Sequence, residues 1–186
     1  VIFMESNNFY INSLDKNASI LLDENIYNSI KNLKKTFNQI IIMCIGTDKI
    51  IADCLGPLVG HILENKFSLK ENIYIYGTLK NPVHSSNIQD YIKFIEKKHS
   101  DYIIIAIDAS LGSLDKIGYI KTGIGQIKPG SGVNKTLPYI GNIYIKGIIQ
   151  DKNTPKSLII QSTSLYNVML MAEKISEGLI KTLIRI

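Results

Sequence analysis

The stretch that decides the fold covers residues 39–63 and reads "QIIIMCIGTDKIIADCLGPLVGHIL". It begins with a β-branched apolar run that ends at Gly46, which is typical of a short strand buried on both faces. From Asp53 onward, apolar residues return at helical spacing as far as Phe67, which predicts a helix. A loop with two acidic residues therefore joins a buried strand to a helix.

The same alternation continues along the chain. Residues 72–77 ("NIYIYG") and 101–108 ("DYIIIAID") predict two more strands, and the apolar stripe of residues 85–99 predicts the helix between them. An earlier helix is expected over residues 23–39. Strands alternating with helices indicate a parallel sheet covered on both faces. The expected fold class is therefore α/β, a three-layer α/β/α sandwich with a mostly parallel, twisted sheet.

The pattern changes in the second half of the chain. Residues 116–123 and 141–150 predict strands around a connector rich in glycine and proline. Residues 157–162 ("SLIIQS") predict a further strand, and a final helix is expected from near Thr163 to the C-terminus.

One domain is expected over residues 1–186. The length of 186 residues suits a single core, and neither an internal repeat nor a linker divides the sequence. Residues 1–19 are polar and weakly patterned, which predicts an N-terminal arm ahead of a core over residues 20–186.

Charge and composition limit the classes of function. The net charge of +5 is spread over separate lysines, which favours solvated helix faces and would help the protein to dock an acidic or DNA-associated partner. Basic residues do not interleave with aromatic ones as in proteins that read single strands, so we expect no direct nucleic-acid contact. Cys44 and Cys54 are expected to be reduced, and no apolar run approaches the roughly 18 residues of a membrane span. The expectation is a soluble, cytoplasmic protein.

The loop after the first strand could in principle cradle a phosphate. A phosphate loop needs GxxxxGK[ST], and a dinucleotide turn needs GxGxxG at the strand end. After Gly46 the next glycine is Gly56, inside the start of the helix, so neither pattern fits. Asp53 also occupies the helix N-terminus where a phosphate would bind, and that position favours a carboxylate. The loop is better interpreted as a support for Asp53.

Two aspartates are the leading candidates for chemistry. Asp53 alone could be an ordinary helix N-cap. Asp108 ends a strongly apolar run, where an acid is costly unless it pairs or reacts. Loops at the carboxyl ends of neighbouring parallel strands converge, and two close carboxyls share a proton. Such a pair can activate water and donate to a carbonyl, which is general acid–base hydrolysis.

Other polar residues admit two interpretations each. His84, in the loop after the second strand, could cap the next helix, orient substrate, carry a proton or bind a metal. Residues 128–135 ("KPGSGVNK") could be a plain connector or a loop at the rim of a site. Ser162, Thr163 and Ser164 are expected to cap the last helix, because no histidine or lysine adjoins them to activate a nucleophile.

Three segments carry a resemblance to a known family. "TDKIIADCLGPLVG" (47–60), "IIIAIDAS" (103–110) and "KTGIGQIKPGSGVNKTLPYIG" (121–141) resemble the motifs of the bacterial spore germination proteases and occur in the same order. The short length better resembles the small YyaC-type sporulation proteins. Both groups are similar in fold to the hydrogenase maturation proteases, which are α/β/α sandwiches.

The resemblance implies an atypical aspartic-type endopeptidase that acts on small acid-soluble spore proteins. The family's two aspartates fall on Asp53 and Asp108, with Ala52 in place of the proline before the first. It also implies a cytoplasmic location, in the forespore or spore core of a spore-forming bacterium, and an assembly into homo-oligomers.

The resemblance further implies a substrate-binding rim. His84 and the segment Gly130, Ser131 and Gly132 are the expected peptide-binding residues.

A metal site is not expected. The hydrogenase maturation relatives bind a metal with two acids and a histidine, but here Lys128, Pro129 and Gly130 stand where that histidine would be. No metal or other cofactor is therefore predicted. Two alternatives stay open, namely a non-catalytic binding protein on this fold and a metal-dependent maturation peptidase.

Overall fold

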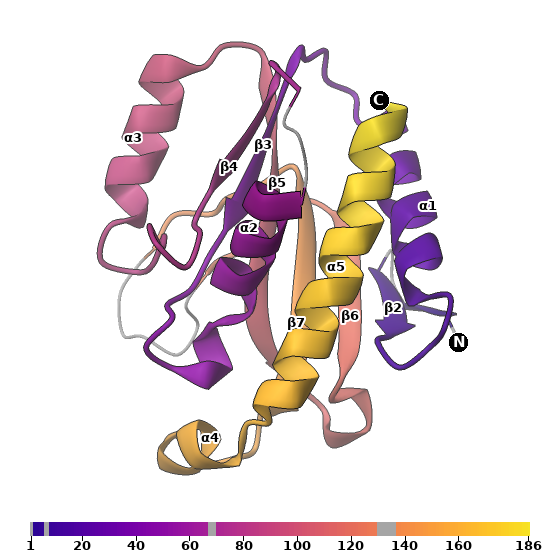
Figure 1. Ribbon diagram of the computed structural model, residues 1–186, viewed down its shortest axis with the longest axis vertical. Coiled ribbons are helices and arrows are strands. Elements are labelled where there is room, and N and C mark those ends of the chain that lie inside the picture. The colour runs from indigo at the N-terminus through magenta and orange to yellow at the C-terminus, as the bar shows by residue number, and fades with distance from the viewer. Residues whose placement is uncertain (1, 6–7, 67–69, 130–136) are drawn as a thin grey trace.

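A seven-stranded sheet forms the centre of the computed structural model, which describes residues 2–5, 8–66, 70–129 and 137–186 (Figure 1). The strand order is β1-β2-β6-β7-β5-β3-β4. The strands are β1 (Ile2–Glu5), β2 (Asn8–Asn12), β3 (Gln39–Cys44), β4 (Ile73–Tyr76), β5 (Tyr102–Gly112), β6 (Tyr119–Ile124) and β7 (Ile143–Asp151).

The sheet has a parallel half and an antiparallel half. β4, β3, β5 and β7 run parallel, and β6, β2 and β1 extend the sheet through antiparallel pairs. The central strands arise from β-branched apolar runs, and Ile41 and Ile42 on opposite faces of β3 are both fully buried. This burial on both faces confirms the predicted α/β fold class.

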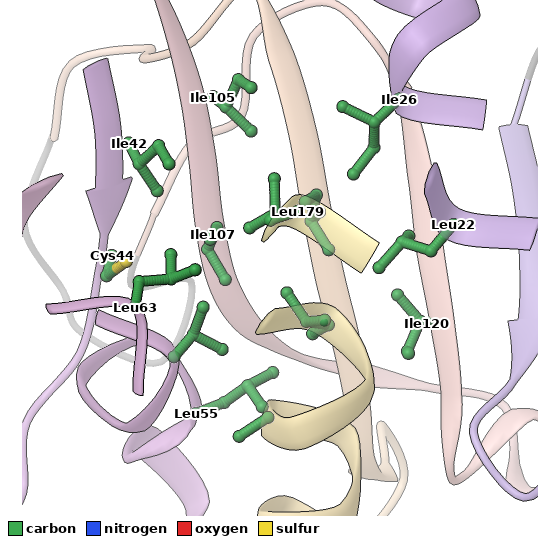
Figure 2. Close-up of a cluster of buried hydrophobic side chains, with 14 of the residues drawn as sticks. Leu22, Ile26, Ile42, Cys44, Leu55, Leu63, Ile105, Ile107, Ile120 and Leu179 are labelled. Atoms are coloured by element: carbon green, nitrogen blue, oxygen red, sulfur yellow. The ribbon is translucent and has the colours of Figure 1, made fainter. Parts of the chain in front are cut away.

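Three helices cover one face. α1, α2 and α5 pack their apolar stripes on the even-numbered residues of β3 and the odd-numbered residues of β5 and β7, as Figure 2 shows for Leu22, Leu55 and Leu179. In Figure 1 the long α5 lies across β7 and β6, between α2 and α1. The helices are α1 (Ala18–Lys31), α2 (Leu55–Lys66), α3 (Ile88–Lys98), α4 (Lys156–Ser162) and α5 (Leu165–Arg185).

The opposite face is covered by α3 over the β3–β4–β5 part of the sheet. Ile88 and Ile95 of α3 join a second apolar cluster with Ile41 and Met43 of β3. Farther along this face, over β6 and β7, Lys121 and Lys146 stand opposite each other in register. The second helical layer therefore leaves a polar strip beside the parallel half of the sheet.

The N-terminal segment differs from expectation. Instead of an arm over residues 1–19, the chain forms β1 and β2 and begins α1 at Ala18. β2 buries Ile11, which is 1 % exposed, against the core, while its neighbours are half-buried. A strand with one buried residue carries too little apolar alternation to be detected in the sequence.

Residues 157–162 form part of α4 and not the predicted strand. A run of six residues is too short for its period to separate strand from helix. The Thr163 hydroxyl donates to the carbonyl of Ile159 at 2.6 Å, which satisfies one of the helix's terminal acceptors. In the described part of the chain no helix is long and apolar enough to cross a membrane.

Candidate active site

A pocket of about 240 Å³ lies at the carboxyl ends of the parallel strands and brings three of the predicted site residues together. Asp53 comes from the loop after β3, His84 from the loop after β4, and Asp108 from β5 itself. Ser85 and Ser110 also line the pocket. The parallel pairing of β3 with β4 and with β5 brings these segments to one edge of the sheet.

Asp53 is held in place by the turn that follows β3. It ends a short 3₁₀ helix (Ile51–Asp53), and its main-chain carbonyl accepts a hydrogen bond from the Thr47 N–H at 2.9 Å. This closes the loop back onto Gly46, whose φ is +141°. A Cβ at Gly46 would lie 2.0 Å from the Asp53 carbonyl oxygen. Gly46 is therefore required for the close approach that places Asp53 at the pocket.

The electrostatic environment of Asp53 favours its protonated form. Burial raises the pKa of this carboxyl to about 6, and the Thr47 N–H opposes the rise only in part. A substantial fraction of Asp53 is therefore protonated in mildly acidic solution. A protonated carboxyl can donate to a substrate carbonyl, which an ordinary surface aspartate cannot do near neutrality.

Asp108 is in a different environment. It is 4 % exposed, and it lies within the longer strand β5 and not at its end as predicted, because β5 continues to pair with β7 as far as Gly112. Its register partner on β7 is Lys146. Burial lowers the pKa of Lys146, Asp108 opposes that change and Lys121 adds to it. An ammonium group beside Asp108 in turn favours the carboxylate.

Lys146 was not identified from the sequence. The signal was a single lysine at an alternate position of the apolar run "GNIYIKGIIQ" (141–150), but its meaning depends on the pairing of β7 with β5. Register between strands distant in sequence cannot be read from the pattern of either strand alone.

His84 is both a turn residue and a pocket residue. Its main-chain N–H donates to the Asn87 side chain at 2.8 Å, and its Nδ1 accepts from the Ser86 N–H at 3.3 Å. In the neutral ring, this acceptor role places the proton on Nε2. The capping and the site interpretations of His84 are therefore compatible.

The predicted rim segment Gly130, Ser131 and Gly132 lies outside the described residues. Pro129 and Leu137, which flank it, both line the pocket.

The described residues do not form a metal site. No three histidine, cysteine, aspartate or glutamate side chains within that part of the chain gather closely enough to hold an ion. Exposed Lys128 and buried Pro129 stand where a third ligand was considered, and neither is a metal ligand. We therefore derive no chemical step through a metal.

Comparison with known proteins gives a family and a distant structural likeness. A family model described as "Protein of unknown function (DUF1256)" matches residues 10–178. The "Uncharacterized protein YyaC" of Bacillus subtilis (strain 168) is 37% identical over 170 residues, which cover 91% of this chain and 81% of that protein. This match confirms the resemblance to the small YyaC-type proteins.

A solved structure, the [NiFe] hydrogenase maturation protease HycI from Thermococcus kodakarensis KOD1, is similar with a TM-score of 0.47 and 18% identity. The similarity covers 83% of this chain and 97% of that one. Likeness at this level does not carry a functional argument, which has to come from the pocket itself.

Proposed function

The chain belongs to the DUF1256 family, and we propose that it is an aspartic-type peptidase that hydrolyses peptide bonds of small spore proteins. The observation that supports this most strongly is the meeting of two unlike carboxyl groups at one pocket. Asp53 has its pKa raised to about 6 by burial, and Asp108 lies in register with Lys146. The motif resemblance to the spore germination proteases supplies the substrate class.

In the first step of the proposed reaction, Asp108 is the base and Asp53 the acid. The Asp108 carboxylate takes a proton from water as its oxygen attacks the scissile carbonyl carbon. The Asp53 carboxyl donates its proton to the carbonyl oxygen, so the tetrahedral intermediate forms as a neutral diol.

The second step reverses the two roles. Asp108, now protonated, donates to the leaving nitrogen, and the Asp53 carboxylate recovers a proton from one hydroxyl as the C–N bond breaks. The products are a carboxylic acid and an amine, and both side chains return to their starting states. Lys146 does not contact the reacting atoms in this scheme and acts through Asp108 as a positioning residue.

Peptide binding is proposed for the residues around the two acids. His84, with a proton on Nε2, can donate to a substrate carbonyl, and Gly130, Ser131 and Gly132 would supply main-chain N–H groups at the rim. The proposal places the protein in the cytoplasm of a forespore or spore core, and includes assembly into homo-oligomers.

The test is cleavage of a purified small acid-soluble spore protein, followed by intact-mass spectrometry and sequencing of new N-termini. Asp53→Asn and Asp108→Asn should each reduce the rate by roughly 10²-fold or more, because each removes one partner of the acid–base pair. Asp48→Asn is the matched control, since Asp48 is an exposed acid in the same loop that does not line the pocket.

Two results would contradict the proposal. Binding of the spore protein without turnover by the wild type would identify a binding protein in place of a peptidase. Cleavage at the wild-type rate by both pocket variants would show that the two carboxyls are not the catalytic groups.

A further inference from the structure

A second and larger pocket, of about 530 Å³, lies at the β4 end of the sheet. It is lined by residues of α2, β4, the loop after β4 and α3. In Figure 1 these elements lie on the side of the molecule away from α1 and β2. None of its lining residues belongs to the candidate active site, so it is a separate feature of the surface.

Three aromatic rings line this pocket. The Tyr76 ring centroid lies 6.0 Å from that of Tyr91 and 5.9 Å from that of Phe94, in both cases with an edge-to-face arrangement. The Tyr76 hydroxyl is fixed by a 2.7 Å hydrogen bond to His99 Nε2, and burial raises the pKa of this phenol, so it stays neutral. Phe94 is 47% exposed, an unusual cost for a large apolar ring on a helix.

Two carboxylates from different helices complete the lining. Glu64 of α2 and Asp90 of α3 are both exposed, and neither forms an ion pair with any residue that the structure describes. Two negative charges next to aromatic faces produce a site that attracts cations, because the face of an aromatic ring is itself electronegative.

The chain shows the same contact beside the pocket. The Lys98 ammonium lies 5.2 Å from the Phe94 centroid and 5.9 Å from the Tyr74 centroid. An ammonium group is therefore already accommodated at the outer aromatic ring by a lysine that does not line the pocket.

We propose that the pocket between α2, β4 and α3 binds an alkylammonium group, held by the rings of Tyr76, Tyr91 and Phe94 and by the carboxylates of Glu64 and Asp90. The ligand is either a free amine or a lysine side chain, which share this chemistry. The inference is independent of the peptidase proposal, since it concerns another pocket and does not require catalysis.

The test is a titration of the full chain with butylammonium and with 1-butanol, its neutral analogue, monitored by NMR of Tyr and Phe ring signals. Butylammonium should bind more tightly than 1-butanol and should shift the signals of Tyr76, Tyr91 and Phe94. Glu64→Gln and Phe94→Leu should each weaken butylammonium binding by roughly two- to fivefold. Glu96→Gln is the matched control, because Glu96 is an exposed acid of α3 that does not line the pocket.

Spermidine and N-acetyl-lysine methylamide distinguish the two sources of the ligand. Tighter binding of spermidine assigns the pocket to free polyamines, and tighter binding of the lysine amide assigns it to a lysine side chain of a partner. Equal affinity for butylammonium and 1-butanol, or butylammonium binding that is unchanged in Glu64→Gln and in Phe94→Leu, would overturn the proposal.

Discussion

Replacing Asp53 by asparagine should stabilise the protein while it removes catalysis. The carboxamide keeps the size of the side chain and an acceptor for nearby N–H groups, but it carries no charge. The buried carboxylate of the wild type, by contrast, must ionise in a poorly solvated place at neutral pH. Asp53→Asn removes that cost.

The magnitude follows from the pKa of Asp53 in the two states. The value is about 6 in the folded protein against the model value of 3.8, and each pH unit of difference is worth about 1.4 kcal/mol. Because the folded pKa is the higher one, the contribution to stability is fully present below about 3.8 and is lost as the pH rises through about 6. The variant should therefore gain about 2 kcal/mol over the wild type between about pH 4.5 and about pH 7.5.

The assay is urea unfolding of the wild type and Asp53→Asn at both pH values. The control is Asp48→Asn, which removes an exposed charge from the same loop. A difference between wild type and Asp53→Asn that does not change with pH would refute the reasoning. A variant less stable than the wild type at about pH 7.5 would refute it as well.

Three further predictions concern the same site. Gly46→Ala should lose about 2 kcal/mol or more in thermal unfolding, since its Cβ would lie 2.0 Å from the Asp53 carbonyl oxygen; Gly125→Ala, with a φ of +133° but no atom within 4 Å of the added Cβ, should lose less, and equal losses would contradict the close contact. Asp108→Asn should destabilise by about 1–3 kcal/mol in urea, opposite in sign to Asp53→Asn, because it leaves the half-buried Lys146 without its neighbouring charge; a stabilised variant would be the contrary result. The kcat/KM of peptide hydrolysis should fall as the pH rises above about 6, where Asp53 loses its proton, and a profile level from about pH 5 to about pH 8 would exclude Asp53 as the acid.

The parallel half of the fold was predictable because its strands are buried on both faces. β3 and β5 come from runs in which nearly every residue is apolar and β-branched, and such runs have few other structures available. β2 and α4 were not predictable, because β2 buries only Ile11 and α4 is too short to show a period.

The candidate site was predictable to the same extent. Asp53 and Asp108 follow from the rule that sites form at the carboxyl ends of parallel strands, and the structure places both at one pocket. Lys146 could not be identified in the same way. Its position beside Asp108 depends on β7 pairing with β5, after the chain has passed through β6 and a long connector.

The central claim is that the pocket holds one protonated and one ionised carboxyl group. A ¹³C NMR titration of the aspartate side-chain carboxyl carbons, assigned with Asp53→Asn and Asp108→Asn, measures it directly. The account predicts that at about pH 5 Asp53 still carries its proton while Asp108 is ionised, and that Asp53 titrates near 6. Titration of Asp53 near its ordinary value of 3.8, or a proton found on Asp108 and not on Asp53, would contradict it.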